Sequence, residues 1–232
     1  MAIYAIADLH LSLNTDKPMD VFGPNWENHY KKIEKNWKET VTEDDTVLIP
    51  GDFSWETYLE NTYKDFEFLN NLPGRKILLK GNHDYWWTTL TSIRNYLKTN
   101  GFDTIDILYN NSYEVEKFVI AGARGWDYTK VNDRKIIERE INRLELSLKD
   151  AISKSNNPII VCMHYPPISS KNTNNEFERK ILYILKEYNV KMCLYGHLHG
   201  TSHCKAINGE VEGIQFELVS SDFLNFKLIK IA

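Results

Sequence analysis

The chain has 232 residues, a length typical of one domain with a substantial core, and 42% of them are hydrophobic while 26% are charged. Its formal net charge of −4 argues against non-specific binding to nucleic acid or to an anionic membrane, since both require a basic face. No apolar run approaches the roughly 20 residues of a membrane-spanning helix, and no linker-like composition divides the chain, so we expect residues 1–232 to form a single domain.

Six short apolar runs, each ended by glycine or by polar residues, predict strands that are buried on both faces. They cover residues 3–10, 46–52, 76–84, 118–126, 159–167 and 192–199. Residues 11–25, which follow the first run, hold two prolines and show no helical period. A loop of this length inside a compact domain is more often functional than idle.

Helical patterns lie between most of these runs, with apolar residues on one face in residues 30–41, 87–97, 137–148 and 177–188. Strands that alternate with helices indicate an α/β architecture. The last residues, 211–232, instead predict consecutive strands, with Asn208–Gly209 as a turn. We therefore expect a mixed sheet, or two packed sheets, rather than a purely parallel one.

The cysteines and the first residues of the sequence predict a cytoplasmic location. The sequence opens without a basic segment, a long apolar segment or a small-residue cleavage site. The three cysteines, Cys162, Cys193 and Cys204, follow no metal-binding spacing, and the first two lie inside apolar runs. Buried free thiols in a reducing compartment are the interpretation that we adopt.

Polar side chains that commonly bind metals follow five of the six predicted strands. They are Asp8 and His10, then Asp52, then Asn82, His83 and Asp84, then His164, and finally His197 and His199. In an open α/β sheet the carboxyl ends of the strands share one edge, where ligands bind. Each residue alone has an ordinary explanation as a cap or a turn, but independent caps would not repeatedly select imidazole. The pattern therefore predicts one shared site.

The residue types at these positions indicate a metal centre. Carboxylate oxygen and neutral imidazole nitrogen favour borderline or hard divalent ions such as Mn, Fe and Zn. On a regular strand Asp8 and His10 would share a face, because side chains alternate with a period of two. The candidate ligands exceed the needs of one tetrahedral ion and suit two ions about 3.5–4 Å apart that share a carboxylate, an arrangement used for phosphoester hydrolysis. They are Asp8, His10, Asp52, Asn82, His164, His197 and His199.

The ordered segments "DLH", "GD", "GNHD", "MH" and "GHLH", which span residues 8–199, resemble the motifs of the calcineurin-like metallophosphoesterase superfamily. The resemblance implies a four-layer α/β/β/α sandwich of two mixed β-sheets flanked by helices, with a dinuclear metal centre at one edge. It implies that one ion is held by Asp8, His10, Asp52 and His199. It implies that the other is held by Asp52, Asn82, His164 and His197. Asn82 and His83 would then face the phosphoryl group, with Asp84 orienting the His83 ring.

One segment departs from the best-known form of the superfamily. Its protein phosphatases follow the second aspartate with "xVDRG", whereas Asp52 is followed here by "FSWE", so the phosphate-binding arginine of that motif is missing. This departure argues against a protein phosphatase. Arg124, at the end of the fourth run, is a candidate for binding phosphate in its place, and the alternative is a surface arginine in a glycine turn. Lys17 and Asp16 are weaker candidates, since loop charges are usually only solvated.

The other histidines and the tryptophans near this edge have mainly structural interpretations. His29 lies in a helical pattern as a surface or packing residue, and His203, close to His199, is also interpreted as structural. We expect most of the tryptophans to pack in the core and a minority to line a pocket for a flat group. They are Trp26, Trp55, Trp86, Trp87 and Trp126.

Our hypothesis for the mechanism is that two metal ions acidify a bridging water, whose hydroxide attacks phosphorus in line. His83 either donates a proton to the leaving oxygen or stabilises the transition state. The expected substrate is a small-molecule phosphomonoester or a nucleotide. Two alternatives stay open. One is a phosphodiesterase acting on nucleotides or nucleic acid, of which the acidic balance and the short chain disfavour only a nuclease. The other is a binding module that has lost catalysis, against which the complete ligand set argues. The sequence does not specify the substrate, the native metal or the oligomeric state.

Overall fold

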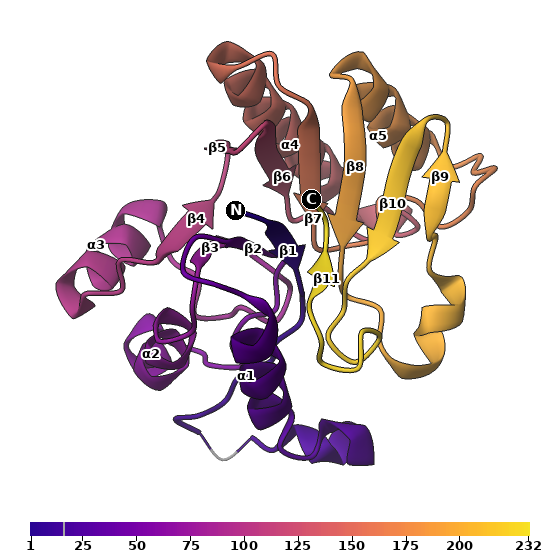
Figure 1. Ribbon diagram of the computed structural model, residues 1–232. Coiled ribbons are helices and arrows are strands. Elements are labelled where there is room, and N and C mark those ends of the chain that lie inside the picture. The colour runs from indigo at the N-terminus through magenta and orange to yellow at the C-terminus, as the bar shows by residue number, and fades with distance from the viewer. Residues whose placement is uncertain (16) are drawn as a thin grey trace.

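The computed structural model describes residues 1–15 and 17–232, and Figure 1 shows how its helices and strands are arranged. The α-helices of this part of the chain are α1 (His29–Thr40), α2 (Tyr63–Asn70), α3 (Leu90–Asn100), α4 (Arg134–Lys154) and α5 (Glu176–Glu187). The strands are β1 (Ile3–Ala5), β2 (Thr46–Ile49), β3 (Arg75–Leu79), β4 (Ile105–Leu108), β5 (Tyr113–Val115), β6 (Phe118–Ala123), β7 (Ile159–Met163), β8 (Val190–Tyr195), β9 (Gly209–Val211), β10 (Ile214–Leu218) and β11 (Ile229–Lys230). Short 3₁₀ helices are η1 (Met19–Phe22), η2 (Pro24–Trp26), η3 (Leu59–Thr62), η4 (Val131–Asp133) and η5 (Gly200–Lys205). No helix in this part of the chain has both the length and the apolar composition needed to cross a membrane.

Two mixed sheets form the centre of the molecule. The first has the strand order β11-β1-β2-β3-β4, in which β1 to β4 are parallel and β11 is antiparallel to β1. The second has the order β5-β6-β7-β8-β10-β9, with β6, β7, β8 and β10 parallel and the edge strands β5 and β9 antiparallel. The predicted α/β class with two mixed sheets is confirmed.

The two sheets pack face to face, and each carries helices on its outer face. Along β2, Val47 belongs to the apolar cluster shared with α1, α2 and α3, while Leu48 points into the cluster between the sheets. Along β7, Val161 belongs to the cluster shared with α4 and α5, while Ile160 belongs, like Leu48, to the cluster between the sheets. This period-two alternation buries both faces of each sheet. The layers are therefore α/β/β/α, as the resemblance implied (Figure 1).

The register of the parallel strands brings their carboxyl ends to one level. Ala123 of β6 pairs with Met163 of β7, which in turn pairs with Tyr195 of β8. An isolated bridge between Ala7 and Ser220 joins the segments that follow β1 and β10, so the ends of the two sheets meet. We call this shared edge, at the carboxyl ends of the parallel strands, the rim.

Several short helices and strands were not predicted from the sequence. All six predicted runs contain a strand, but β4, β5 and helix α2 were not predicted, because three to eight residues carry too little of a period. Helix α3 begins at Leu90, whereas the predicted helix began at residue 87. Thr89 caps α3 and accepts a hydrogen bond from the Ser92 N–H at 3.2 Å. Residues 11–25 include η1 and most of η2 rather than only irregular loop.

The predicted turn at Asn208–Gly209 was wrong. The two residues that connect β9 to β10 are Glu212 and Gly213, with positive φ angles of 51° and 84°. Gly209 is already part of β9, and the Asn208 side chain accepts a hydrogen bond from the Leu218 N–H at 2.7 Å. The pairing of β10 with β8 and β9 sets the register here, and it overrides the turn preference of the Asn-Gly pair.

Candidate metal centre

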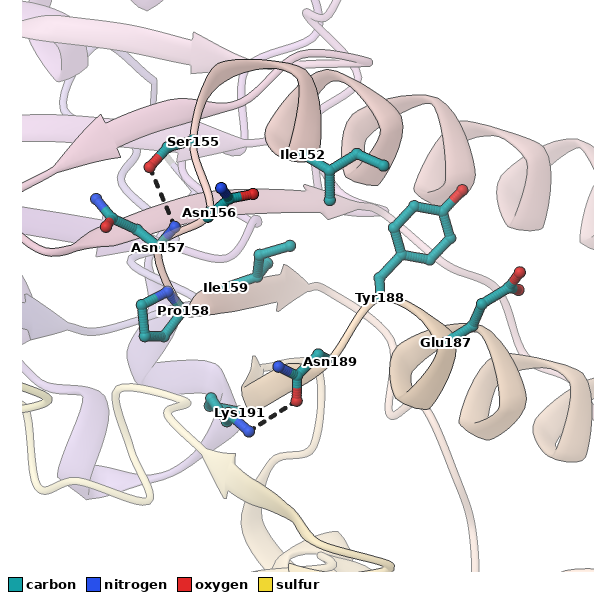
Figure 2. A pocket seen from close by; sticks show the side chains of 10 residues that line it. All are labelled: Ile152, Ser155, Asn156, Asn157, Pro158, Ile159, Glu187, Tyr188, Asn189 and Lys191. Atoms are coloured by element: carbon teal, nitrogen blue, oxygen red, sulfur yellow. Dashed lines mark hydrogen bonds between the residues drawn. The ribbon is translucent and has the colours of Figure 1, made fainter.

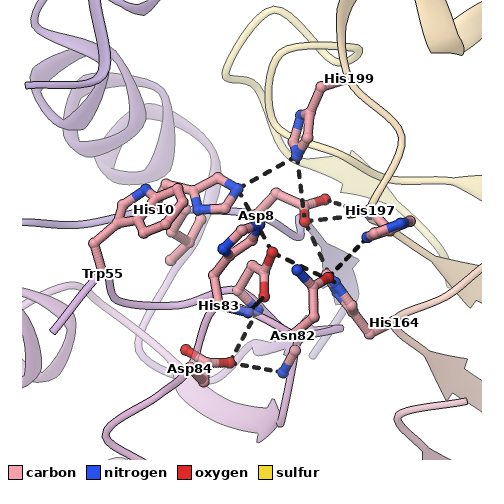
Figure 3. Close-up of polar contacts among 12 residues, drawn as sticks. Asp8, His10, Trp55, Asn82, His83, Asp84, His164, His197 and His199 are labelled. Atoms are coloured by element: carbon pink, nitrogen blue, oxygen red, sulfur yellow. Dashed lines mark hydrogen bonds and ion pairs between the residues drawn. The ribbon is translucent and has the colours of Figure 1, made fainter. Parts of the chain in front are cut away.

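The seven predicted metal ligands all lie at the rim, although they come from distant parts of the chain. They follow β1, β2, β3, β7 and β8, whose carboxyl ends were predicted to share one edge. Figure 3 shows the labelled side chains of six of them turned towards one another. These are Asp8, His10, Asn82, His164, His197 and His199.

Three of these residues, Asp8, His10 and His199, form a first ligand group, whose ligand atoms all lie within 4.8 Å of one another. His10 Nε2 is 3.3 Å from His199 Nε2, and His199 Nε2 is 3.7 Å from Asp8 Oδ1. His199 Nδ1 donates a hydrogen bond to Asp222 Oδ1 at 2.8 Å, so Nε2 is the nitrogen that faces the group. Such a fixed ring orientation is typical of metal-binding histidines.

A second ligand group consists of Asn82, His164 and His197. Asn82 Oδ1 lies 2.6 Å from His164 Nε2 and 2.8 Å from His197 Nδ1. His164 Nδ1 donates to the Pro50 carbonyl oxygen at 3.0 Å, and burial lowers the pKa of His164 to about 3, so its neutral ring presents a lone pair at Nε2. The amide oxygen of Asn82 also presents lone pairs. Two facing sets of lone pairs are stabilised by a cation between them, so these residues fit a metal ion.

Asp52 lies between the two ligand groups. Its Oδ2 atom is 3.4 Å from His164 Nε2 and 3.7 Å from His10 Nε2, while Oδ1 accepts a hydrogen bond from the His83 N–H at 2.8 Å. Oδ2 is buried and has no hydrogen-bond partner among the described residues. A buried carboxylate oxygen is rarely left unpaired, and ions bound by both groups would pair it.

The charges at the rim favour bound cations. Burial, together with the charge of Asp8, raises the pKa of Asp52 well above its usual value. Burial alone would lower the pKa of His199, but the carboxylates of Asp8 and Asp222 raise it to about 10. The carboxylates thus retain a proton on a histidine that would otherwise be neutral, and a divalent ion would satisfy the same demand for positive charge.

The backbone at the rim is strained where ligands leave the strands. Asp8, His10, Asp52 and His197 have positive φ angles of 59°, 44°, 52° and 74°, a region that side-chain-bearing residues seldom adopt. Strand β1 already ends at Ala5, so the prediction that Asp8 and His10 share a face of a regular strand was wrong. They converge through left-handed turns instead, and such strain is concentrated at functional sites.

Glycines at the rim allow close approach to the carboxylates. A Cβ atom on Gly196 would lie 2.5 Å from Asp8 Oδ2, and one on Gly81 would overlap the Asp52 side chain. Neither Gly81 nor Gly196 has a positive φ. Space is the reason for glycine at both positions.

Asp84 orders the backbone around the site and does not orient the His83 ring. Its carboxylate accepts hydrogen bonds from the backbone N–H groups of Asp52, Phe53, Ser54 and Gly81 and from the indole N–H of Trp86. These bonds use both oxygens, and none involves the His83 ring, so the predicted contact was wrong. The N-cap of the following helix, α3, is Thr89.

The His83 ring lies beside both ligand groups without belonging to either. Its centroid is 4.2 Å from the Trp55 ring and 5.6 Å from the His10 ring. Its Nδ1 atom is buried and has no hydrogen-bond partner among the described residues. Burial, followed by the charge of His197, lowers the pKa of His83. The ring is therefore not tied to another side chain and is available to a bound substrate.

Sequence reasoning missed Asp222, which positions a candidate ligand. Its Oδ1 accepts from His199 Nδ1, while Oδ2 accepts from the Gly200 N–H at 3.0 Å and lies 3.2 Å from His203 Nε2. Asp222 follows β10 at the rim, so the same strand-end reasoning would have found it. The segment 211–232 had been interpreted only as consecutive strands, and β10 was not placed beside β8.

Lys17 and Asp16 were the weaker candidates for binding phosphate, and His29 was predicted to be a surface or packing residue. Lys17 is exposed to solvent, and its Nζ donates to the Trp55 carbonyl oxygen at 2.8 Å. Asp16 lies outside the described residues. His29 is buried, with Nε2 3.1 Å from the Leu9 carbonyl oxygen beneath the rim, which confirms packing over surface exposure.

A pocket of about 460 Å³ lies away from the rim (Figure 2). Its lining includes Ser155 and Asn157 before β7, and Asn189 and Lys191 at the start of β8. These positions are at the opposite ends of the strands from His164 and His197. It includes none of the residues in the two groups of possible metal ligands among the described residues, which are Asp8, His10 and His199, and Asp8, Asp52 and His164.

Comparison with known proteins identifies a related family. The sequence model of the calcineurin-like phosphoesterases matches residues 1–201, whereas no curated protein matches the chain. The structure of AQ665 from Aquifex aeolicus, a protein of unknown function, is 18% identical with a TM-score of 0.52, covering 99% of this chain and 95% of that one. That of TT1561 from Thermus thermophilus is 13% identical with a TM-score of 0.57, covering 99% and 97%. These two likenesses concern the fold.

Proposed function

Because this chain belongs to the calcineurin-like phosphoesterase family, we propose that it hydrolyses phosphoesters with two divalent metal ions held at the rim. Family membership and the gathered ligand atoms support metal-dependent hydrolysis. The single observation that carries the proposal of two ions is the position of Asp52 Oδ2. This atom is buried, lies between the two ligand groups, and is unpaired among the described residues.

The proposed ions divide the ligands between them. One would be held by Asp8, His10, Asp52 and His199, and the other by Asp52, Asn82, His164 and His197, with Asp52 shared. Ions of the Mn, Fe or Zn type suit this oxygen and nitrogen donor set. When bound, they supply an activated water and neutralise charge on the phosphoryl oxygens.

The residues of the chain orient the reaction. Asn82 contributes a neutral oxygen, which limits the negative charge that faces a phosphoryl group. Asp84 fixes the loop after β2 through the Phe53 and Ser54 N–H groups, at 2.9 and 3.1 Å, and so sets the position of Asp52. We propose that the His83 ring, whose Nδ1 has no hydrogen-bond partner among the described residues, contacts the phosphoryl group or the leaving oxygen.

Arg124 stays a candidate for binding phosphate. It follows β6 at the rim, and its carbonyl oxygen accepts from the N–H groups of His164 and Tyr165, both at 3.0 Å. Its guanidinium lies over the Trp126 ring, 4.7 Å from the centroid, and 3.4 Å from the buried Glu140. Arg124 Nε has no hydrogen-bond partner among the described residues. Only 15% of its side chain is exposed, so Arg124 is partly buried rather than fully solvated.

Arg143 provides a matched control for Arg124, because it also contacts Glu140, at 3.2 Å. If Arg124 binds the phosphoryl group, Arg124→Ala is expected to lower kcat/KM about 10-fold or more, as loss of a charge-assisted hydrogen bond does. Arg143→Ala is expected to leave it unchanged. Steady-state kinetics of both variants, with thermal unfolding as the stability readout, measure the difference. Equal losses in the two variants would reduce Arg124 to a structural partner of Glu140.

Metal removal and restoration test the proposed function directly. Chelator-treated protein is expected to be inactive on 4-nitrophenyl phosphate and to regain activity with Mn²⁺, Fe²⁺ or Zn²⁺ as bound metal approaches two ions per chain. Bis(4-nitrophenyl) phosphate, assayed in parallel, tests the phosphodiesterase alternative. A protein that binds two ions but hydrolyses neither ester would contradict the proposal and favour a binding module.

We further propose a small-molecule phosphoester as the substrate and a cytoplasmic location. The net charge of −4 supports a small substrate over nucleic acid. The free thiols of Cys162, Cys193 and Cys204, of which the first two are buried, support a reducing compartment.

A further inference from the structure

A pocket of about 410 Å³ opens directly beside the first ligand group. His10 and His199, which belong to that group, line it together with His83. Its volume is within the roughly 300–1,000 Å³ of small-molecule sites. A molecule whose phosphoryl group lies at the metal centre would therefore extend into this pocket, on the side of His83. We call it the aromatic pocket.

The other walls of the aromatic pocket come from residues 19–26, from the loop after β2, and from the segments after β8 and β10. The Trp55 ring stacks on the His10 ring, with centroids 5.1 Å apart, and Figure 3 shows the two side chains next to each other. The Phe22 ring is parallel to Trp55, at an interplanar angle of 4° and a centroid distance of 6.4 Å. Trp26 presents its ring at a steep angle to His10 and to His199, at 5.8 and 5.7 Å. A flat ring that enters finds aromatic faces on several sides.

Lys17 and Met19 hold Trp55 in place, whereas Phe22 is open to solvent. The Trp55 indole N–H points to Met19 Sδ at 2.8 Å, and the backbone carbonyl oxygen of Trp55 accepts a hydrogen bond from Lys17 Nζ. In contrast, 64% of Phe22 is exposed to solvent. A ligand ring stacked on Phe22 would remove apolar surface from water, which favours binding. Phe22 is thus the member of the wall that gains most from a ligand.

The charge of the aromatic pocket indicates what kind of group it accepts. None of the described residues that line it is a lysine or an arginine. Its one carboxylate, that of Asp222, already accepts hydrogen bonds from His199 and from the Gly200 N–H. Apart from His199, which the proposed function assigns to a metal ion, no lining side chain among the described residues carries a positive charge that could pair with a second anionic group. Asn25 and Thr201, which also line the pocket, offer an amide and a hydroxyl to the polar edge of a ring.

We propose that the aromatic pocket binds the leaving group and selects phosphoesters whose alcohol carries a flat, uncharged aromatic ring, as nucleoside monophosphates do. This inference rests on the proposed function, because the phosphoryl group must lie at the metal centre. In the reaction the bond between phosphorus and the leaving oxygen breaks, and a bond from phosphorus to a water oxygen forms. The leaving oxygen receives a proton, and the products are the ring-bearing alcohol and phosphate.

Two esters that differ by a single base test this selection. Adenosine 5′-monophosphate carries adenine, and ribose 5-phosphate lacks it. Phe22→Ala is expected to lower kcat/KM for the nucleotide about fivefold or more, as loss of base stacking on an aromatic side chain does, and to leave ribose 5-phosphate unchanged. Val21→Ala is the matched control, because Val21 is 72% exposed on the same 3₁₀ helix but does not line the aromatic pocket. Val21→Ala is expected to change neither value.

A binding measurement separates failure of this inference from failure of the proposed function. In saturation-transfer NMR, the base protons of adenosine are expected to give signals with wild type and with Val21→Ala, and weaker ones with Phe22→Ala. If neither ester is hydrolysed but adenosine binds through Phe22, the aromatic pocket stands and the proposed function fails. If phosphoesters are hydrolysed but Phe22→Ala affects both esters alike or neither, the inference is overturned and the proposed function stands.

Discussion

Replacing Asp52 by asparagine is expected to lower kcat by more than the roughly 10- to 100-fold lost when a residue that only orients a ligand is removed. The asparagine keeps an oxygen for the His83 N–H, which donates to Asp52 Oδ1 at 2.8 Å. It replaces only Oδ2 and its charge, which lie 3.4 Å from His164 Nε2 and 3.7 Å from His10 Nε2. Bound metal, measured by elemental mass spectrometry, is expected to fall below two ions per chain.

The same substitution is not expected to destabilise the metal-free protein. Burial, with the nearby charges of Asp8 and Asp84, raises the pKa of Asp52 well above its usual value. A carboxyl group whose pKa rises on folding lowers stability at any pH above its unfolded pKa, because the ionised form is disfavoured in the folded state. At neutral pH the Asp52→Asn variant is therefore expected to show an unchanged or higher Tm by scanning calorimetry.

Asp45 offers a buried carboxylate away from the rim as the matched control. Its Oδ1 accepts from the Ala2 N–H at 2.6 Å, and its Oδ2 accepts from the Thr42 N–H and hydroxyl, both at 2.8 Å. Asp45→Asn is expected to lower the Tm, since it replaces an acceptor that two donors use, while kcat stays unchanged. Equal activity in the Asp52→Asn and Asp45→Asn variants would contradict the bridging position of Asp52.

The candidate ligands were predictable because topology, rather than side-chain packing, brings them together. His164 directly follows β7, and Asp52 follows β2 by three residues, so parallel pairing alone carries both to the rim. A metal-binding residue that follows any of the buried parallel strands lies at the rim, whatever the conformation of its side chain. Asp222 is reached in the same way once β10 is known to run parallel to β8.

Roles that depend on the direction of one side chain were not predictable from spacing. Asp84 follows His83 directly, yet its carboxylate turns towards the N–H groups of the loop after β2, which are distant in sequence. The positive φ angles at Asp8 and His10 likewise come from contacts with other segments, since the His10 N–H donates to the Asp52 carbonyl oxygen. The aromatic pocket is a tertiary feature for the same reason, because its lining comes from the segments that follow β1, β2, β3, β8 and β10.

Replacing His83 by alanine is expected to lower kcat about 10²- to 10⁴-fold, the usual contribution of a general acid or base, while metal content stays unchanged. The ring lines the aromatic pocket, whereas the link to Asp52 is made by the backbone N–H, which alanine retains. Tyr85→Ala is the control, because Tyr85 is 59% exposed two residues away and does not line the pocket. Near-wild-type kcat in His83→Ala protein with its metals in place would remove His83 from the chemistry.

The leaving group distinguishes the two possible roles of His83. Burial and the charge of His197 lower its pKa, so a proton-donor role requires the anionic phosphoryl group of the substrate to restore a proton to the ring. If His83 donates that proton to the leaving oxygen, His83→Ala is expected to slow phenyl phosphate far more than 4-nitrophenyl phosphate, since nitrophenolate leaves without protonation. If the ring instead stabilises charge on the phosphoryl oxygens, both esters lose the same factor. Comparing kcat for the two esters in wild type and variant therefore shows whether His83 donates the proton to the leaving oxygen. We expect the larger loss for phenyl phosphate, because the ring lines the side of the site into which the leaving group extends.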